Sequence, residues 1–233
     1  IREGYYLAIN PRSQKLYYQD IFLNVDKIEI KKKHITRTWI GPGNITNYYP
    51  VSPTQFALGT TNKIGLVEAD DPAAGKVLYT ETSVLQPIST IRVFSQMFLL
   101  VLWITFIFAG LLGYSIFGLL YLMNKKKYKP LLRIGILPTL TSLMILLILY
   151  PQFFGIENAD LLLSQPTFIS VSLLILSLLF VMGALTSGII LYRLIKLKIN
   201  RLIYYFLAIL SGLHTIASIY LMYFGFIPLI TWG

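Results

Sequence analysis

The pattern of hydrophobic and polar positions divides the chain into two parts. Up to about residue 92, short apolar runs alternate with turn-forming residues, whereas Val93 to Met123 contains no Asp, Glu, Lys, Arg or His. A helix of that length measures roughly 45 Å at about 1.5 Å per residue, which is enough to cross a bilayer. Three more apolar runs follow, at about residues 134–154, 167–191 and 202–225. The pattern predicts a membrane α-helical bundle of four transmembrane helices over residues 93–233.

The first part has the pattern of β structure. Runs rich in β-branched and aromatic residues predict strands at residues 5–10, 15–23, 27–31, 34–40, 55–58, 63–69 and 76–82. Turn residues separate the runs, for example at 24–26 and 41–44, and the first two strands are expected to form a hairpin. Short strands at this spacing predict a small all-β domain over residues 1–82, an antiparallel barrel or sandwich, with a lipocalin-like barrel as one form. About 90 residues bury only a modest core.

Residues 83–92 are predicted to connect the two parts. Pro87 argues against one unbroken helix from Ser83. Ile88, Ile91 and Phe94 have roughly the spacing of a helix that lies on the membrane surface before the chain enters it.

Composition places the chain in the membrane class. It has 55% hydrophobic and 13% charged residues in 233, and a mean hydropathy of +0.66. Soluble domains are nearer to about 25% charged. The chain has no cysteine, which excludes disulfides and thiolate metal sites.

The net charge of +10 reflects topology rather than nucleic-acid binding. Two short loops, residues 124–133 and 192–201, contain nine basic residues and no acid: Lys125, Lys126, Lys127, Lys129, Arg133, Arg193, Lys196, Lys198 and Arg201. The loop at 155–166 has Glu157 and Asp160 and no base. The positive-inside rule predicts a multi-pass protein of the cytoplasmic (inner) membrane, with residues 1–92 and the C-terminus outside. The expected partner is a bilayer with anionic head groups at the cytoplasmic face, and not nucleic acid.

One histidine lies within the predicted spans. His214 shares a polar stripe with Ser211, Thr215 and Ser218 at helical spacing. The stripe could ligate haem, relay a proton or hydrogen-bond between helices. No other His or carboxylate lies within a span, so helix packing is favoured and neither cofactor nor metal is predicted. The spans also contain small residues at four-residue spacing, such as Gly183 with Ser187, which indicate close helix packing within the bundle.

Motifs of known catalytic machinery are missing from the sequence. It contains no Gly-x-Ser-x-Gly, Ser-x-x-Lys, His-Glu-x-x-His or Lys-Thr-Gly motif and no glycine-rich phosphate loop. The adjacent carboxylates Asp70 and Asp71 precede Pro72 and Gly75, which is typical of a hairpin turn. No catalytic residue is predicted.

The order of several short motifs resembles a known family. These are Gly4-Tyr5-Tyr6, Asn10-Pro11-Arg12-Ser13, Ile28-Glu29-Ile30, the run Tyr49-Pro50-Val51-Ser52-Pro53-Thr54-Gln55-Phe56, and Gly75-Lys76-Val77 before a long span. Together they resemble the C-terminal region of membrane-anchored serine hydrolases of the penicillin-binding-protein and class C beta-lactamase superfamily. The likeness covers about residues 1 to 123. The resemblance implies a hydrolase domain followed by a small β domain and membrane helices, with the active serine upstream of Ile1.

Two main hypotheses follow for the function. The leading one is a non-catalytic accessory and membrane-anchoring region of such a hydrolase, with an upstream catalytic domain as partner. The hydrolase would act outside the membrane on peptidoglycan-like peptides, D-amino-acid peptides, esters or lactams. The alternative is a stand-alone membrane sensor or assembly subunit whose β domain binds a ligand or partner. A small-molecule transporter is disfavoured because the spans hold almost no ionisable residue.

Overall fold

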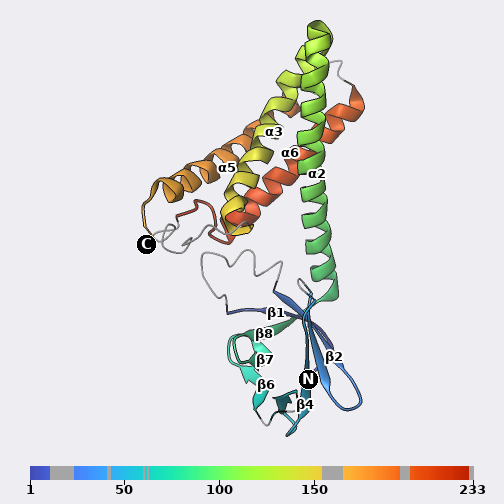
Figure 1. Ribbon diagram of the computed structural model, residues 1–233, viewed down its shortest axis with the longest axis vertical. Coiled ribbons are helices and arrows are strands. Elements are labelled where there is room, and N and C mark those ends of the chain that lie inside the picture. Colours follow the sequence, from blue (N-terminus) through green and yellow to red (C-terminus); the bar gives the residue numbers. More distant parts are fainter. Residues whose placement is uncertain are drawn as a thin grey trace. The chain divides into compact units, whose positions relative to one another are not determined.

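The computed structural model describes residues 1–10, 24–40, 43–59, 61, 63–153, 165–194 and 200–230. The chain forms two compact units, Ile1–Leu99 and Leu100–Gly233. The first holds the strands and the beginning of the first long helix, and the second holds the rest of that helix and three more (Figure 1). Each unit is described by itself.

The first unit is a closed barrel of eight antiparallel strands, which confirms the predicted β domain and selects a barrel over a sandwich. Each strand pairs with its neighbours in sequence, and β1 pairs with β8 to close the sheet. Closure removes every exposed sheet edge. The strands are β1 (Gly4–Ala8), β2 (Val25–Ile30), β3 (Ile35–Trp39), β4 (Ile45–Pro50), β5 (Gln55–Leu58), β6 (Ile64–Asp71), β7 (Gly75–Thr80) and β8 (Val84–Ile88).

Several strand predictions need correction. The interpretation of residues 24–26 as a turn was wrong, because β2 already begins at Val25. As Pro87 indicated, no helix begins at Ser83, but the connector at residues 83–92 contains strand β8 and the start of α2 instead of a separate surface helix. Strand β4 was not predicted. The strand expected at residues 15–23, and so its hairpin with residues 5–10, lies outside the described residues.

Alternation along the strands fills the barrel interior with apolar side chains. The buried interior cluster consists of Tyr6, Ala8, Ile28, Ile35, Tyr48, Phe56, Leu66, Leu78 and Leu85. A second cluster forms outside the barrel, where Leu7 of β1 and Val25 of β2 pack with Val93. Val93 belongs to the first turn of helix α2, so the helix begins against the outer surface of the barrel.

Four helices are long and apolar enough to cross a membrane, as predicted. They are α2 (Thr90–Met123), α3 (Lys125–Phe153), α5 (Phe168–Leu194) and α6 (Arg201–Tyr223). Each covers its predicted span to within a few residues, except that α3 begins nine residues earlier, at Lys125 instead of residue 134. The four basic side chains Lys125, Lys126, Lys127 and Lys129 thus lie on the first turns of α3 and not in a loop.

Small residues bring α3 and α5 close together. A Cβ atom added to Gly183 of α5 would lie 2.6 Å from Oγ1 of Thr141 on α3. The contact at Gly183 indicates that this small residue allows close packing within the bundle, which is the interpretation that the sequence favoured for Gly183 and Ser187. The segment after α6 also packs on α5, because the backbone N–H of Leu229 donates to Ser177 Oγ at 3.1 Å.

Candidate functional site

The interior of the barrel is apolar along most of its length but charged near one end. Asp26 lies two residues before the interior Ile28 on β2, and Arg37 lies two residues after the interior Ile35 on β3. A period of two therefore turns both charged side chains inward. Strands β2 and β3 are neighbours with Ile28 opposite Arg37, so Asp26 and Arg37 meet on a diagonal across the pair.

Asp26 and Arg37 form a largely buried ion pair. The Arg37 Nη2 group donates to Asp26 Oδ2 at 2.9 Å. The side chain of Asp26 is only 3% exposed, whereas that of Arg37 is 22% exposed. Burial raises the pKa of the Asp26 carboxyl above its usual value, although the hydrogen bond and the charge of Arg37 oppose this shift.

The second carboxylate oxygen of Asp26 is unsatisfied. Oδ1 is buried and has no hydrogen-bond partner in the described part of the chain. A buried carboxylate oxygen without a donor is costly, because burial removes bulk water from it. The site therefore favours a ligand, or a water held by a ligand, that brings an N–H or O–H group.

A cavity of about 220 Å³ adjoins the ion pair. Its lining is mainly polar: Ala8, Asn24, Asp26, Arg37, Trp39, Asn44, Thr46, Thr82 and Ser83. A second hollow of about 180 Å³ also touches Arg37 and is lined by Thr46, Tyr48, Leu58, Gly65, Thr80, Glu81 and Thr82 as well. Arg37, Thr46 and Thr82 line both hollows. We call the first of these hollows the mouth cavity.

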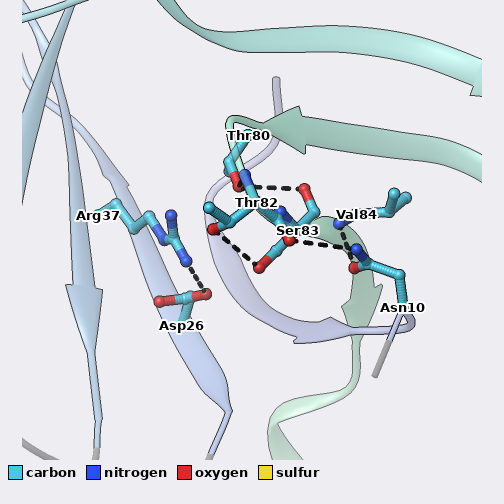
Figure 2. A network of polar contacts seen from close by, with 7 residues as sticks. All are labelled: Asn10, Asp26, Arg37, Thr80, Thr82, Ser83 and Val84. Carbon is cyan, nitrogen blue, oxygen red and sulfur yellow. Dashed lines mark hydrogen bonds and ion pairs between the residues drawn. The ribbon is translucent and has the colours of Figure 1, made fainter. Parts of the chain in front are cut away.

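The turn between β7 and β8 forms a fixed wall of the mouth cavity (Figure 2). Thr80 Oγ1 accepts the backbone N–H of Ser83 at 2.9 Å and donates to the Ser83 carbonyl at 3.1 Å. Asn10 lies two residues after the end of β1; its Oδ1 accepts the N–H of Val84 at 2.6 Å and its Nδ2 donates to the Thr82 carbonyl at 3.2 Å. Thr82 and Ser83 are thus positioned before any ligand arrives, which lowers the entropy cost of binding.

The mouth cavity has groups that can recognise a small molecule. Amide and hydroxyl side chains supply both donors and acceptors, Trp39 supplies an aromatic surface, and the charges of Asp26 and Arg37 cancel. This chemistry suits a small neutral ligand rich in hydroxyl or amide groups. Across the described residues, no three His, Cys, Asp or Glu side chains lie close enough together to hold a metal ion.

The polar stripe predicted on α6 does not act as one group. Thr215 Oγ1 donates to the Ser211 carbonyl at 2.9 Å, and Ser218 Oγ donates to the His214 carbonyl at 2.8 Å, so both hydroxyls bond to their own helix. Ser211 Oγ is buried, with no partner among the residues that the structure describes. Among the described residues, only His214 of these four side chains hydrogen-bonds to other helices.

His214 joins three helices through a chain of hydrogen bonds. The Trp103 Nε1–H group of α2 donates to Nδ1 of His214 at 2.9 Å. An indole N–H can only donate, so Nδ1 carries no proton and Nε2 carries one. Nε2 lies 2.9 Å from Ser142 Oγ of α3, which itself donates to the Pro138 carbonyl at 3.0 Å. With a neutral imidazole, every polar group in this series of hydrogen bonds from Trp103 to Pro138 has a partner. This supports the packing interpretation.

Sequence reasoning missed the ion pair of the barrel. Asp26 was assigned to a turn, and Arg37 was included in a predicted strand without a role. A weak signal was present, since Arg37 stands at the same alternate positions as Ile35 and Trp39, where an apolar residue is expected on a strand with one buried face.

Comparison with known proteins gives no relative: no protein family, no curated protein and no solved structure matches this chain.

Proposed function

We propose that this chain is a non-catalytic, membrane-anchored binding module whose barrel takes up a small polar ligand in the mouth cavity. The observation that carries the proposal is the buried Oδ1 of Asp26, which lacks a donor beside a cavity lined with amides and hydroxyls. The four apolar helices hold the module in the membrane. This is the sensor or assembly-subunit hypothesis with its binding site specified.

The ligand class follows from the lining. The ion pair leaves no net charge, so neither an anion nor a cation is favoured electrostatically. Hydroxyl groups of a ligand can donate to Asp26 and accept from Asn44 or Thr82, while a ring packs on Trp39. A saccharide unit or a similar polyol fits this pattern. A zwitterionic dipeptide is the contrasting ligand, because its charges would have to compete with the existing ion pair.

Ligand titration of the full chain tests the proposal. The reporter is Trp39 fluorescence in a Trp103→Phe/Trp232→Phe background, and the probes are N-acetylglucosamine and D-alanyl-D-alanine. Saturable binding of N-acetylglucosamine that is lost in Asp26→Asn and Thr82→Val, and kept in the control Asp70→Asn on β6, is the expected result. A signal that does not saturate, or that survives Asp26→Asn unchanged, would refute it.

The serine-hydrolase hypothesis is the second candidate. It is supported by the resemblance in motif order, whose elements Gly4-Tyr5-Tyr6 and Gly75-Lys76-Val77 lie in β1 and β7. In this proposal the barrel packs beside an upstream catalytic domain, and the helices anchor that enzyme at the outer face of the cytoplasmic membrane. A penicillin-like acylating probe should leave the chain of residues 1–233 unlabelled, and a Ser-x-x-Lys motif should be encoded upstream of Ile1. Covalent labelling of the chain alone would contradict it.

The orientation is proposed from the loops. The basic residues near the α2–α3 connection and at residues 192–201 face the cytoplasm, so residues 1–92 and the C-terminus lie outside. The chain has no cysteine, which makes single-cysteine variants clean reporters. Cysteines at Lys126 and Asn158 should react with an impermeant reagent from opposite sides of the membrane. Labelling from the same side would contradict the orientation.

A further inference from the structure

An apolar groove lies between three helices of the second unit. It measures about 220 Å³ and is lined from α2 by Ala109, Gly110, Gly113, Tyr114 and Phe117, from α3 by Leu131, Gly135 and Thr139, and from α6 by Leu202, Ile203, Phe206 and Leu207. The neighbouring helices α2, α3 and α6 are visible in Figure 1. The lining comes from the part of each helix nearest the α2–α3 connection at Asn124 and the start of α6 at Arg201.

Glycine creates the space in this groove. A Cβ atom added to Gly113 would meet no atom within 4 Å, so the position opens into unfilled volume. At Gly110, by contrast, a Cβ atom would lie 2.9 Å from Cδ2 of Leu210, which shows that α2 and α6 are already in contact there. The helices thus touch at one level and separate at the next. A largely apolar groove between membrane spans suits hydrocarbon better than water, because it offers a water molecule few polar partners.

Basic residues at this end of the bundle have no carboxylate to pair with among the described residues of the second unit. In the second unit, residues 100–153, 165–194 and 200–230 contain no Asp or Glu, while Lys125, Lys126, Lys127, Lys129, Arg133, Arg193 and Arg201 are all cationic. Their counter-charge must come from outside the described unit. The phosphate groups of membrane lipids are the anions present at the depth where a span ends.

One lysine continues the groove along α3. Lys127, Leu131, Gly135 and Thr139 follow one another at four-residue intervals, so they share one face of the helix. The last three line the groove, and Lys127 lies one turn beyond it toward the end of the helix. Lys129 is two residues away from Lys127 and therefore lies on the opposite side of α3.

We infer that this groove is a binding site for an anionic glycerophospholipid, with an acyl chain between α2, α3 and α6 and the head-group phosphate at Lys127. The apolar lining accounts for the acyl chain. The basic cluster, which has no carboxylate partner among the described residues, accounts for the preference for negative charge, and the Nζ group of its Lys127 lies 5.3 Å from the centre of the Tyr128 ring. The site is independent of the ligand proposed for the barrel, since it lies entirely within the second unit.

The test is lipid retention by the purified full chain in detergent, measured by native mass spectrometry after addition of 1-palmitoyl-2-oleoyl phosphatidylglycerol or the matching phosphatidylcholine. Wild type should retain a defined number of phosphatidylglycerol molecules in preference to phosphatidylcholine. Gly113→Leu, whose Cβ atom would meet no other atom within 4 Å, places a side chain in the groove and should abolish the defined binding. Gly118→Leu is the matched control, because Gly118 is also on α2, also has an open Cβ position and does not line the groove.

The head-group contact has its own pair of variants. Lys127→Gln should weaken phosphatidylglycerol retention about fivefold, the effect expected for one lysine at a membrane surface. Lys129→Gln removes the same charge from the opposite side of the helix and should change retention much less. Equal retention of both lipids by wild type, equal loss in Gly113→Leu and Gly118→Leu, or equal effects of the two lysine variants would each overturn the site.

Discussion

Trp103 donates its indole N–H to Nδ1 of His214 across a distance of 2.9 Å and a sequence separation of 111 residues. The two rings meet edge to face, with centroids 6.2 Å apart. This bond ties α2 to α6 and fixes which nitrogen of His214 carries the proton. Since α2 buries the smallest share of its residues among the four spans, a single polar contact contributes noticeably to its position.

Removal of the indole donor should loosen α2. Trp103→Phe keeps an aromatic ring but leaves Nδ1 of His214 without a donor, and we expect a loss of about 1 kcal/mol in the free energy of unfolding, typical of an interhelical hydrogen bond in a membrane. Unfolding of the reconstituted chain in increasing sodium dodecyl sulfate, followed by helical circular dichroism, measures it.

A hydroxyl on the same helix provides the control for this prediction. Thr105 Oγ1 donates to the Val101 carbonyl of its own helix at 2.8 Å. Thr105→Val therefore removes a bond that holds no second helix, and its effect should be near zero. Equal destabilisation by Trp103→Phe and Thr105→Val would show that the contact with His214 does not stabilise the bundle.

The tautomer of His214 is a second expected outcome. With Trp103 donating to Nδ1, nitrogen-15 spectra of the histidine-labelled protein at pH 7 should show a neutral ring with its proton on Nε2. Trp103→Phe removes the constraint at Nδ1 and should permit a mixture of tautomers. A spectrum of the Nδ1–H form in the wild-type protein would contradict the hydrogen-bond chain to Ser142.

The helices could be predicted from sequence because their signal is local. A run such as Val93 to Met123, without any Asp, Glu, Lys, Arg or His, identifies a span whatever it packs against. Strand β4 gave a weaker signal, because Ile45 and Tyr49 are exposed and only Tyr48 is fully buried. In β8, Pro87 correctly argued against a helix but hid the strand, because proline is uncommon in strands and is accommodated in this one.

The candidate site depends on contacts that no short segment contains. Asp26 meets Arg37 because of the register between β2 and β3, and that register is set by the whole barrel. The partners of His214 come from α2 and α3, far away in sequence. The histidine itself could be singled out from sequence, because an ionisable group inside the membrane is rare.

Close packing of α3 and α5 predicts a strong effect at Gly183. Gly183→Ala places a methyl group 2.6 Å from Thr141 Oγ1, well inside contact distance, and we expect a loss of about 1–3 kcal/mol as the helices separate. Gly188→Ala on the same helix meets no atom within 4 Å and should be nearly neutral. Denaturant titration of both variants measures the difference.

A double variant separates the clash from any other cause. Thr141→Ala removes the atom that the new methyl group meets, so Gly183→Ala combined with Thr141→Ala should lose less stability than the two single variants added together. Strict additivity would show that the effect of Gly183→Ala arises elsewhere.

The buried carboxyl of Asp26 predicts an unusual pH dependence for the barrel. Burial raises its pKa above the ordinary 3.8, so the folded barrel holds the proton more tightly than the unfolded chain does. The stabilising contribution of Asp26 is complete below pH 3.8 and is lost as the pH rises through the folded-state pKa. The difference in unfolding free energy between wild type and Asp26→Asn should therefore decline over that interval and then stay level.

Asp71 provides the opposite case. Its Oδ1 accepts the backbone N–H groups of Ala74 and Ala73, each at 2.8 Å, which lowers the pKa of this exposed carboxyl. Its contribution is present above pH 3.8 and is lost as the pH falls through the lowered pKa, so the difference between wild type and Asp71→Asn should change with the opposite sign. Trp39 fluorescence in the Trp103→Phe/Trp232→Phe background reports unfolding of the barrel. If the two differences in unfolding free energy change with pH in the same direction, Oδ1 of Asp26 has a donor in solution. The unsatisfied oxygen would then no longer support a ligand in the mouth cavity.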